Sequence, residues 1–419
     1  MIKSGVQKIK DKFSNNIKVV ENYFFMTALQ IINSIFGIMI YPFVIRILGA
    51  SSYGLYVFAL SVTTYFIGFI SFGFSFPSIK AIIANKDNLD AKSAIISSVF
   101  TAKLYLAIVS LVIFLVLLFT IPIMRENKLI FSIVFSQIIG EILFPVWYFQ
   151  GMQKMKLVTF IQLTFRIVSL PFIFLFIKSP ADNCIYAAIT SLTVVLGGIS
   201  ALILLQSKEK ISFQFVSMRK LKSYFQDALP FFWSSITGIL KQESVTVIIG
   251  SFFGMRDVAL YDLANKIIIL PRLLTTSING ALFPRVMENI QKSVVKKIIR
   301  YETYIGLAVI AGVVIFGYWI ILFLGGKQMI DTYPLSIILS ATVLVWLVVG
   351  CYISFIFVPE NKYYFVTRNQ LVALIIFFVF CIPGVLIFHN ILVVVASLTF
   401  SGLGEIVYCN YLIKKHKLL

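Results

Sequence analysis

Long apolar stretches follow one another along the chain, and each is closed by a turn residue or by charge. A helix of roughly 20 apolar residues crosses a bilayer core of about 30 Å, and these stretches reach that length. They lack the alternation at every second position that the strands of a membrane barrel show. The pattern predicts an all-α membrane protein with twelve transmembrane helices, over residues 19–48, 53–78, 94–120, 129–150, 157–178, 183–206, 227–253, 258–284, 303–326, 332–358, 364–388 and 390–413.

The composition indicates the same class. Hydrophobic residues make up 59% of the 419, the mean hydropathy is +0.96, and only 13% of residues are charged. A water-soluble chain of this length could not bury so much apolar surface. The predicted loops are short, so a soluble catalytic domain is not expected. The first apolar run is too long for a cleavable signal peptide and is expected to remain as a membrane span.

The positive charges predict the orientation of the chain. Most of the 36 Lys and Arg residues lie in loops on the side of the N-terminus. The loops of the opposite side hold only Arg125, Lys128, Lys178, Arg256 and Lys327. Basic loops stay in the cytoplasm, so a multi-pass protein of the bacterial inner membrane with both termini cytoplasmic is expected. The net charge of +19 is spread over many loops, which argues against nucleic acid as a partner.

The cysteines and histidines predict no metal site and no cofactor. They show none of the paired spacings that metal-binding or redox motifs require. The residues concerned are Cys184, Cys351, Cys381, Cys409, His389 and His416.

Two segments of the chain are similar to each other. Residues 48–59 read LGASSYGLYVFA and residues 253–264 read FGMRDVALYDLA, so that Gly49 matches Gly254. Both lie at the turn between the first two helices of a six-helix set. The repeat predicts two pseudo-symmetric six-helix lobes around a central cavity, with access to the cavity alternating between the two sides of the membrane. The lobes would comprise residues 1–210 and 211–419.

Ionisable residues inside the predicted spans are candidates for function, because a charge at the bilayer centre costs at least ~2.5–3.5 kcal/mol. Helical phase places polar residues of three predicted helices on one face each, while Glu243 points away from its stripe. Three such faces predict a shared water-filled cavity with net positive charge. The stripes are Thr27, Gln30, Ser34, Gly37 and Tyr41; Ser234, Thr237, Gly238, Lys241 and Ser244; and Asp262, Asn265, Lys266, Arg272, Thr276 and Asn279.

Several of these charges have structural interpretations as well. Asp262 stands four residues before Lys266, the favourable order for an ion pair along one helix. Lys103 is expected to extend to the membrane interface. Arg46 either lines the outer cavity mouth or anchors a helix end. Arg166 and Glu141 either form a buried salt bridge or contact the cargo.

A cationic cavity predicts an anionic cargo. Guanidinium groups bind phosphate through two parallel hydrogen bonds, and ammonium groups bind it as point charges. Lys241 and Arg272 lie deep in their spans without an obvious local partner and are the first candidates for cargo contact. The further candidates are Lys266, Arg46, Arg166, Gln30 and Asn265.

Short motifs, in a consistent order, carry a family resemblance. They are Arg46-Ile-Leu-Gly49 with Tyr53-Gly-Leu-Tyr56, then Phe74-Ser-Phe-Pro-Ser-Ile-Lys80, then Pro145 to Met155 (PVWYFQGMQKM), then Gly254 to Lys266. With them, nearly the whole chain resembles Wzx-type polysaccharide flippases, or O-antigen repeat-unit transporters. This family belongs to the multidrug/oligosaccharidyl-lipid/polysaccharide exporter superfamily. Lys80 stands where many relatives have Arg.

The resemblance implies a function. The cargo would be an undecaprenyl-pyrophosphate-linked oligosaccharide, flipped from the cytoplasmic to the outer leaflet for O-antigen or other surface polysaccharide. The pyrophosphate would meet the cavity cations while the polyprenyl tail stays among membrane lipids. Transport would be secondary, as in an antiporter, coupled to H⁺ or Na⁺ with Glu141, Asp262 and Glu243 as candidate sites. A glycan polymerase and chain-length proteins are the implied protein partners.

Three alternatives remain open at this point. A cation-coupled multidrug exporter of the same superfamily would usually carry acidic rather than basic cavity residues. A membrane glycan polymerase or ligase would be an enzyme with a sizeable outer loop, and no such loop is predicted. A scaffold without cargo would leave the deep cations unexplained.

Overall fold

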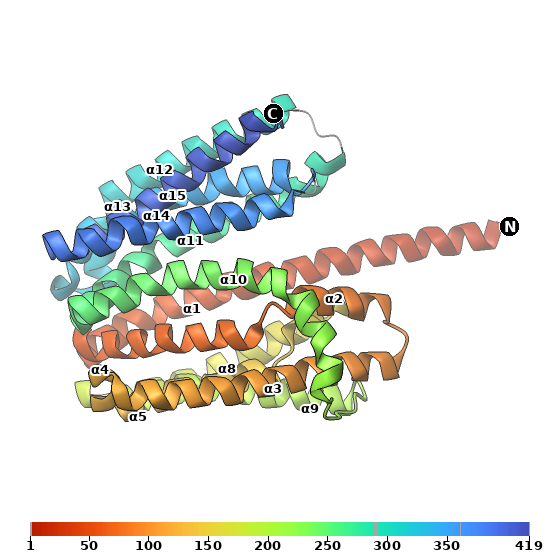
Figure 1. Cartoon of the computed structure of the whole chain (residues 1–419), viewed down its shortest axis with the longest axis horizontal. Coiled ribbons are helices and arrows are strands. Elements are labelled where there is room, and N and C mark those ends of the chain that lie inside the picture. The colour runs from red at the N-terminus through yellow and green to blue at the C-terminus, as the bar shows by residue number, and fades with distance from the viewer. Residues whose placement is uncertain (1, 289–291, 361, 419) are drawn as a thin grey trace. The chain divides into compact units, whose positions relative to one another are not determined.

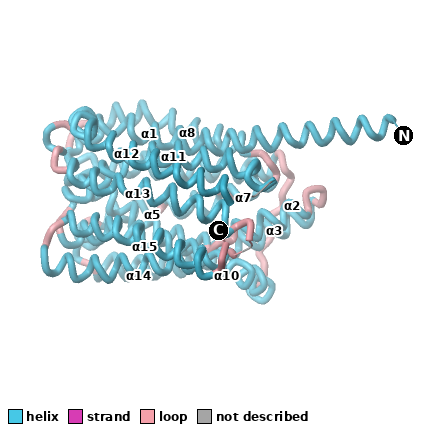
Figure 2. Tube along the Cα trace, turned by 90° about the horizontal axis from the view of Figure 1, so that it is seen from above, coloured by secondary structure: helices cyan, strands magenta, loops and turns pink. Residues whose placement is uncertain are grey.

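The fold is known from a computed structural model. It describes the backbone of residues 2–288, 292–360 and 362–418, and the side chains of residues 21, 24–273, 293–360, 362 and 364–418. Within these ranges most of the chain is helical, the helices are joined by loops, and there is no strand (Figure 1; Figure 2). The α-helices are α1 (Ile2–Ser71), α2 (Ser75–Ala84), α3 (Leu89–Thr120), α4 (Pro122–Glu126), α5 (Lys128–Phe135), α6 (Gln137–Leu143), α7 (Val146–Gly151), α8 (Met155–Phe176), α9 (Asn183–Ser207), α10 (Met218–Phe252), α11 (Met255–Glu288), α12 (Lys292–Gly325), α13 (Thr332–Tyr352), α14 (Tyr363–Phe388) and α15 (Ile391–Lys415).

The predicted all-α membrane fold is confirmed. Among the described residues, nine helical segments are long and apolar enough to cross a membrane. The first, Phe24–Ser71, is 48 residues long and reverses direction within its length. Helices α10 and α11, which carry several intramembrane charges, are not among the nine. Each predicted span has a helical counterpart, and the count of twelve transmembrane helices stays a prediction.

The chain divides into two compact units. Unit 1 comprises Met1–Asn33, Phe66–Phe176 and Cys184–Phe232, and unit 2 comprises Ser34–Tyr65, Ile177–Asn183 and Trp233–Leu419. Residues 34–65 thus pack with the C-terminal helices of unit 2. The division into lobes at residue 210 stays a prediction.

The internal repeat has a structural counterpart in unit 2. Gly49 (φ 76°) reverses the chain within α1, and Gly254 (φ 106°) does so between α10 and α11. Glycine adopts positive φ without the steric cost that a side chain adds. Tyr56 and Tyr261, which follow at matching positions, are both buried. The matched residues therefore share a backbone conformation and a packing role.

The predicted span at residues 129–150 is interrupted. Helices α5, α6 and α7 replace one continuous helix, with breaks at Ser136 and at Phe144-Pro145. Pro145 has no backbone N–H and cannot extend the preceding hydrogen-bond ladder, which accounts for the second break.

An extended segment after α9 packs along α3 in unit 1. A row of hydroxyls at four-residue spacing on α3 satisfies its backbone. Ser93 Oγ accepts from the backbone N–H of Ser212 (3.3 Å), and Thr101 Oγ1 accepts from that of Val216 (3.4 Å). Between them, Ser97 Oγ accepts from the N–H of Gln214 (3.1 Å) and donates to the carbonyl of Ser212 (3.3 Å). The segment thus satisfies its backbone without joining a helix or a sheet.

The same segment is fixed at its start by Glu209. Its carboxylate accepts hydrogen bonds from Lys154 and from the Tyr148 hydroxyl (2.9 Å for the latter). Burial acts to raise the pKa of Glu209, and these two hydrogen bonds act to lower it. The positive charges of Lys154 and Lys92 act in the same direction, so the pKa of Glu209 lies below its ordinary value.

Helix α13 is central in unit 2, where it packs against α11, α12 and α15. Helices α14 and α15 lie side by side in both views (Figure 1; Figure 2). A π-helical turn, Ile353–Phe357, continues α13. Apolar side chains of α13, α14 and α15 form the core, with Phe355, Phe357 and Phe365 fully buried. This packing holds the three helices that form one side of the candidate site.

Candidate functional site

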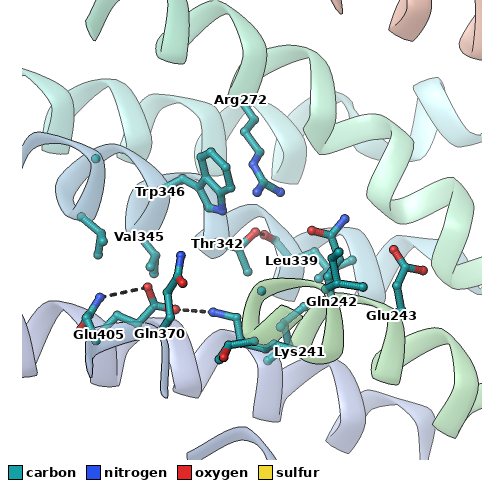
Figure 3. Close-up of a pocket in the computed structure, with 18 of the residues that line it drawn as sticks. Lys241, Gln242, Glu243, Arg272, Leu339, Thr342, Val345, Trp346, Gln370 and Glu405 are labelled. Carbon is teal, nitrogen blue, oxygen red and sulfur yellow. Dashed lines mark hydrogen bonds and ion pairs between the residues drawn. The ribbon is translucent and has the colours of Figure 1, made fainter. Parts of the chain in front are cut away.

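A cavity of about 640 Å³ lies inside unit 2. Five helices line it: α10, α11, α13, α14 and α15 (Figure 3). Its volume is within the range of about 300–1,000 Å³ that is typical of small-molecule sites. All of its lining residues fall between Ser234 and Glu405, in the second half of the chain.

The predicted polar stripe of α10 faces this cavity. Ser234, Thr237, Gly238 and Lys241 all line it, as their spacing of three to four residues predicts. Glu243 lines it as well, which corrects the prediction that this side chain points away (Figure 3). Ser61 of α1 lies near its carboxylate. Ser235, Ile239 and Gln242 line the cavity as well, so it extends around more of α10 than the stripe alone.

Lys241 is ion-paired with Glu405 of α15 (Figure 3). The second carboxylate oxygen, Oε2, accepts from Asn369 Nδ2 of α14 (3.3 Å). No local spacing in the sequence indicates this partner of Lys241, because Glu405 stands 164 positions away. Glu405 was visible in the sequence only as an acidic residue inside a span. Its pairing joins α10, α14 and α15 at one point of the cavity wall.

Arg272 enters the cavity from α11. Its guanidinium carbon lies 3.2 Å from the centroid of the Trp346 ring of α13 (Figure 3). A cation over an indole face is attracted by the ring quadrupole, and a flat guanidinium also stacks well there. Asn265, about two turns earlier on α11, lines the same cavity. Lys241, Asn265 and Arg272 thus line one cavity, whereas no residue of the polar stripe predicted on the first helix lines it. The contact of these three residues with a cargo stays a prediction.

Neutral polar groups complete the lining. Ser234 donates a hydrogen bond to the side-chain carbonyl of Gln370 (3.1 Å), and Gln242 and Thr342 add an amide and a hydroxyl. The sequence analysis missed Asn369 and Gln370. The signal for them was their position as adjacent amides at the start of the long apolar run of α14.

The predicted net positive charge of the cavity needs correction. Two cations, Lys241 and Arg272, line it together with two carboxylates, Glu243 and Glu405. Lys266, which was expected to add a third positive charge, does not line it. The cavity therefore has balanced formal charge, and its polarity comes from paired charges and amides rather than from an excess of cations.

Lys266 and Asp262 form the predicted ion pair along α11. Asp262 also accepts a hydrogen bond from the Tyr53 hydroxyl (2.8 Å), and Lys266 lies over the rings of Tyr41 and Tyr53, 5.4 and 5.7 Å from their centroids. Tyr41 thus contributes to this cluster and not to the lining of the cavity. The cluster connects α1 to α11 within unit 2. The side chains of Thr276 and Asn279, the last members of the predicted α11 stripe, lie outside the described residues.

Arg46 contacts a helix end. Its Nη2 donates to the carbonyl of Phe323 at the end of α12 (2.9 Å). Of the two roles that the sequence left open for Arg46, lining the outer cavity mouth or anchoring a helix end, this contact supports the second. The contact satisfies one of the last carbonyls of α12, which have no partner inside the helix.

The remaining candidates lie in unit 1. Lys103 is 4% exposed and bonded to Glu141 through both its carboxylate (2.8 Å) and its backbone carbonyl (3.0 Å). Ser71 donates to the same carboxylate oxygen (2.9 Å). The prediction that Lys103 extends to the interface is therefore wrong, because the half-buried carboxylate of Glu141 is within its reach. Arg166 lies half-buried on α8, and Gln30 is exposed on α1.

Metal chemistry has no support in the part of the chain that the structure describes. There, no three His, Cys, Asp or Glu side chains come together as a metal site would require. The four cysteines are free thiols, and three of them are buried.

Comparison with known proteins gives relatives of one kind. The sequence is 24% identical to a curated protein of Escherichia coli (strain K12) over 68% of this chain and 69% of the relative. It is 23% identical to one of Shigella dysenteriae over 84% and 89%. Both relatives bear the name "Putative O-antigen transporter".

Solved structures share the fold. The lipid II flippase MurJ, in an inward closed conformation, superimposes with a TM-score of 0.74 at 14% identity, over 94% of this chain and 87% of MurJ. A multidrug resistance MATE family transporter of the MOP superfamily, facing inward, gives a TM-score of 0.66 at 13% identity, over 93% and 95%.

A family assignment follows from the sequence itself. The sequence model of the family described as "Polysaccharide biosynthesis protein" matches residues 19–291, well over half of the chain. The match covers helices α1 to α11, including the cavity residues of α10 and α11. The chain therefore belongs to the polysaccharide biosynthesis protein family, as its motifs predicted, and has the all-helical fold of MurJ and the MATE transporters.

Proposed function

We propose that this protein is a secondary transporter that flips a lipid-linked oligosaccharide across the bacterial inner membrane for surface polysaccharide synthesis. The observation that carries the proposal is the cavity of unit 2, in which Lys241 and Arg272 stand among amides and hydroxyls of five long helices. Family membership and the names of the two curated relatives support the same function.

The chemistry of the cavity suits a phosphate-linked glycan. Arg272 and Lys241 are the groups that would meet an undecaprenyl-linked pyrophosphate. Gln242, Asn265 and Gln370 offer both donors and acceptors, which sugar hydroxyls require. Two carboxylates in the same wall would prevent the site from holding a diphosphate too tightly to release it.

The outer surface of unit 2 suits a lipid tail. Many exposed side chains of α12 and α14 are large and apolar, among them Phe323, Ile387 and Phe388, each more than two-thirds exposed. In a bilayer such faces lie against acyl chains, and a polyprenyl chain is equally apolar. The tail would therefore remain in the membrane while the diphosphate and the sugars pass through the protein.

Transport would proceed by alternating access, with both termini in the cytoplasm and the lobes at residues 1–210 and 211–419 moving against each other. A proton or sodium gradient would supply the energy. Of the coupling candidates, Glu141 and Asp262 are held in ion pairs and do not line the cavity, which favours Glu243. The glycan would pass to a polymerase and its chain-length partners.

A second candidate function is export of cationic drugs. Glu243 and Glu405 in the cavity favour it, because carboxylates bind cationic drugs and the MATE transporter shares the fold. The two functions differ in phenotype: a drug exporter alters drug sensitivity, and a flippase alters surface glycan.

The deciding experiment is complementation. The gene is deleted in its host, and wild type, Lys241→Ala and Arg272→Ala are returned at equal expression. Wild type restores surface polysaccharide and both variants fail to do so, without a change in drug sensitivity. Normal surface glycan in the deletion strain, with increased drug sensitivity, would refute the proposal in favour of drug export.

A further inference from the structure

The surroundings of the ion pair between Lys241 and Glu405 allow its two partners to separate. It lies in the cavity wall, and its side chains are 21% and 10% exposed, so a ligand in the cavity can reach the ammonium group. Glu405 also has a second attachment, through Oε2 to Asn369 Nδ2. Its carboxyl group can therefore stay in place when Lys241 leaves it.

We infer that Glu405 is an exchangeable counter-ion. The phosphate or diphosphate of the cargo replaces Glu405 at Lys241, and the displaced carboxylate takes up one proton from water. Proton and anion thus occupy the site together and do not compete for it. This inference rests on the proposed function and adds to it the residue that changes charge when the cargo binds.

The charges around Glu405 explain the proton uptake. Lys241 is its ion-pair partner, and removal of this cation leaves a carboxylate in a low-dielectric wall, which neutralises readily. Arg272 on α11 is the other cation of the lining, and Glu243 on α10 adds a negative charge. The lining residues of α13 and α14 carry no charge, and on α15 itself the nearest titratable group is the Cys409 thiol. When a second negative charge binds at Lys241, protonation of Glu405 is therefore the change that costs the least free energy.

Asn369 is placed to accept a hydrogen bond from the protonated carboxyl group of Glu405. It is 1% exposed, and its side-chain carbonyl oxygen, Oδ1, is buried without a hydrogen-bond partner. An amide has a donor end and an acceptor end. While Glu405 is charged, Nδ2 donates to it; once Glu405 is protonated, rotation of the amide lets Oδ1 accept its O–H. Asn369 therefore stabilises both states, and its unsatisfied atom has a use in the second.

The exchange is tested by anion binding to the purified full-length protein in detergent. The probes are farnesyl diphosphate and inorganic pyrophosphate, which separate a lipid-linked diphosphate from a free one. Affinities are measured at about pH 8 and about pH 6 for wild type, Glu405→Gln, Lys241→Ala and Lys241→Arg. Asp331→Asn is the matched control, since it breaks an exposed ion pair of unit 2 with Arg256 outside the cavity (2.7 Å).

Wild type should bind farnesyl diphosphate more tightly as the pH falls, by up to about tenfold per pH unit for one proton taken up. Glu405→Gln should bind more tightly than wild type at the higher pH, and its advantage should vanish at the lower. The titration of the diphosphate itself is common to both proteins and cancels in this comparison. Asp331→Asn should follow wild type, Lys241→Arg should retain binding, and Lys241→Ala should lose it.

Proton uptake gives a second readout that needs no variant. In weakly buffered solution with a pH indicator, wild type should take up more protons on binding than the ligand's own titration supplies. If Glu405→Gln binds no more tightly than wild type at the higher pH, or wild type takes up no extra proton, the exchange is refuted while diphosphate binding stands. If wild type binds neither probe, diphosphate cargo is refuted and the exchange with it. If pyrophosphate and farnesyl diphosphate bind with equal affinity, the inference that the diphosphate is lipid-linked is refuted, while the exchange at Lys241 stands.

Discussion

The guanidinium of Arg272 lies over the indole of Trp346, with 3.2 Å between the guanidinium carbon and the ring centroid. The contact joins α11 to α13 inside the cavity and fixes the plane of the guanidinium, so that its N–H groups point in set directions (Figure 3). A cargo phosphate would meet an oriented donor set rather than a mobile one, which reduces the entropy lost on binding.

Trp346→Ala should therefore impair transport without unfolding the protein. A cation–π contact is worth about 0.5–2 kcal/mol, so flipping in liposomes should slow roughly 2- to 30-fold. Trp346→Phe should lose less, because a smaller aromatic face remains. Trp319→Ala, which removes an exposed tryptophan of α12, is the control and should transport normally. Equal rates for Trp346→Ala and wild type would show that the stacking has no role in transport.

Lys103 and Glu141 should contribute to the stability of the fold and not to the coupling of transport to an ion gradient. Removing one member of a buried ion pair costs about 3–5 kcal/mol, and the lower end applies here because the Glu141 side chain is 33% exposed. Lys103→Met should lower the apparent melting temperature in detergent, and Lys103→Met with Glu141→Gln should recover much of the loss. A double variant that is as unstable as the single one would mean that the two residues do not act as a pair.

The contribution of the Glu209 carboxylate to the free energy of unfolding should depend on pH. Its pKa is lower in the folded protein than in the unfolded chain, so the carboxylate favours folding above the unfolded value of about 4.3. That contribution is lost as the pH falls through the folded pKa. Glu209→Gln should melt a few degrees below wild type at neutral pH, and the two melting temperatures should converge in acid. A difference that widens on acidification would contradict this assignment.

The hydroxyl row on α3 predicts the protease sensitivity of the segment after α9. Ser97→Ala removes the acceptor for the Gln214 N–H and the donor to the Ser212 carbonyl, at a cost of about 1–3 kcal/mol. Trypsin should then cleave faster at Lys208 and Lys210. Ser223→Ala is the matched control, because that exposed serine bonds only locally, to the carbonyl of Lys220, and its cleavage rate should equal that of wild type.

Local patterns in the sequence predicted much of this molecule, and the reason is physical. Helix length, the positive-φ glycines 49 and 254, and the Asp262–Lys266 pair depend on residues within a few positions of one another. Periodicity likewise identified most of the cavity face of α10, because residues three and four apart share one side of a helix. On α11 it identified only Asn265 and Arg272, since Asp262 and Lys266 pair with each other away from the lining.

Pairings between helices could not be predicted in this way. Lys241 and Glu405 stand 164 positions apart, and Lys103 and Glu141 stand 38 apart, so no local spacing relates them. The carboxylates made the cavity balanced in charge where the sequence suggested an excess of cations. Asn369, Gln370 and Trp346 were missed for the same reason, since only packing of α13 and α14 brings them to the site.

The most direct test of the central claim is transbilayer movement in reconstituted liposomes. Purified protein is placed in vesicles with a fluorescent polyprenyl-diphosphate oligosaccharide in the inner leaflet, and its arrival at the outer leaflet is followed by a membrane-impermeant quencher. We predict transfer well above that in protein-free vesicles, and its loss in Lys241→Ala and Arg272→Ala. Transfer by wild type no faster than in empty vesicles, or unchanged transfer by both variants, would contradict the account.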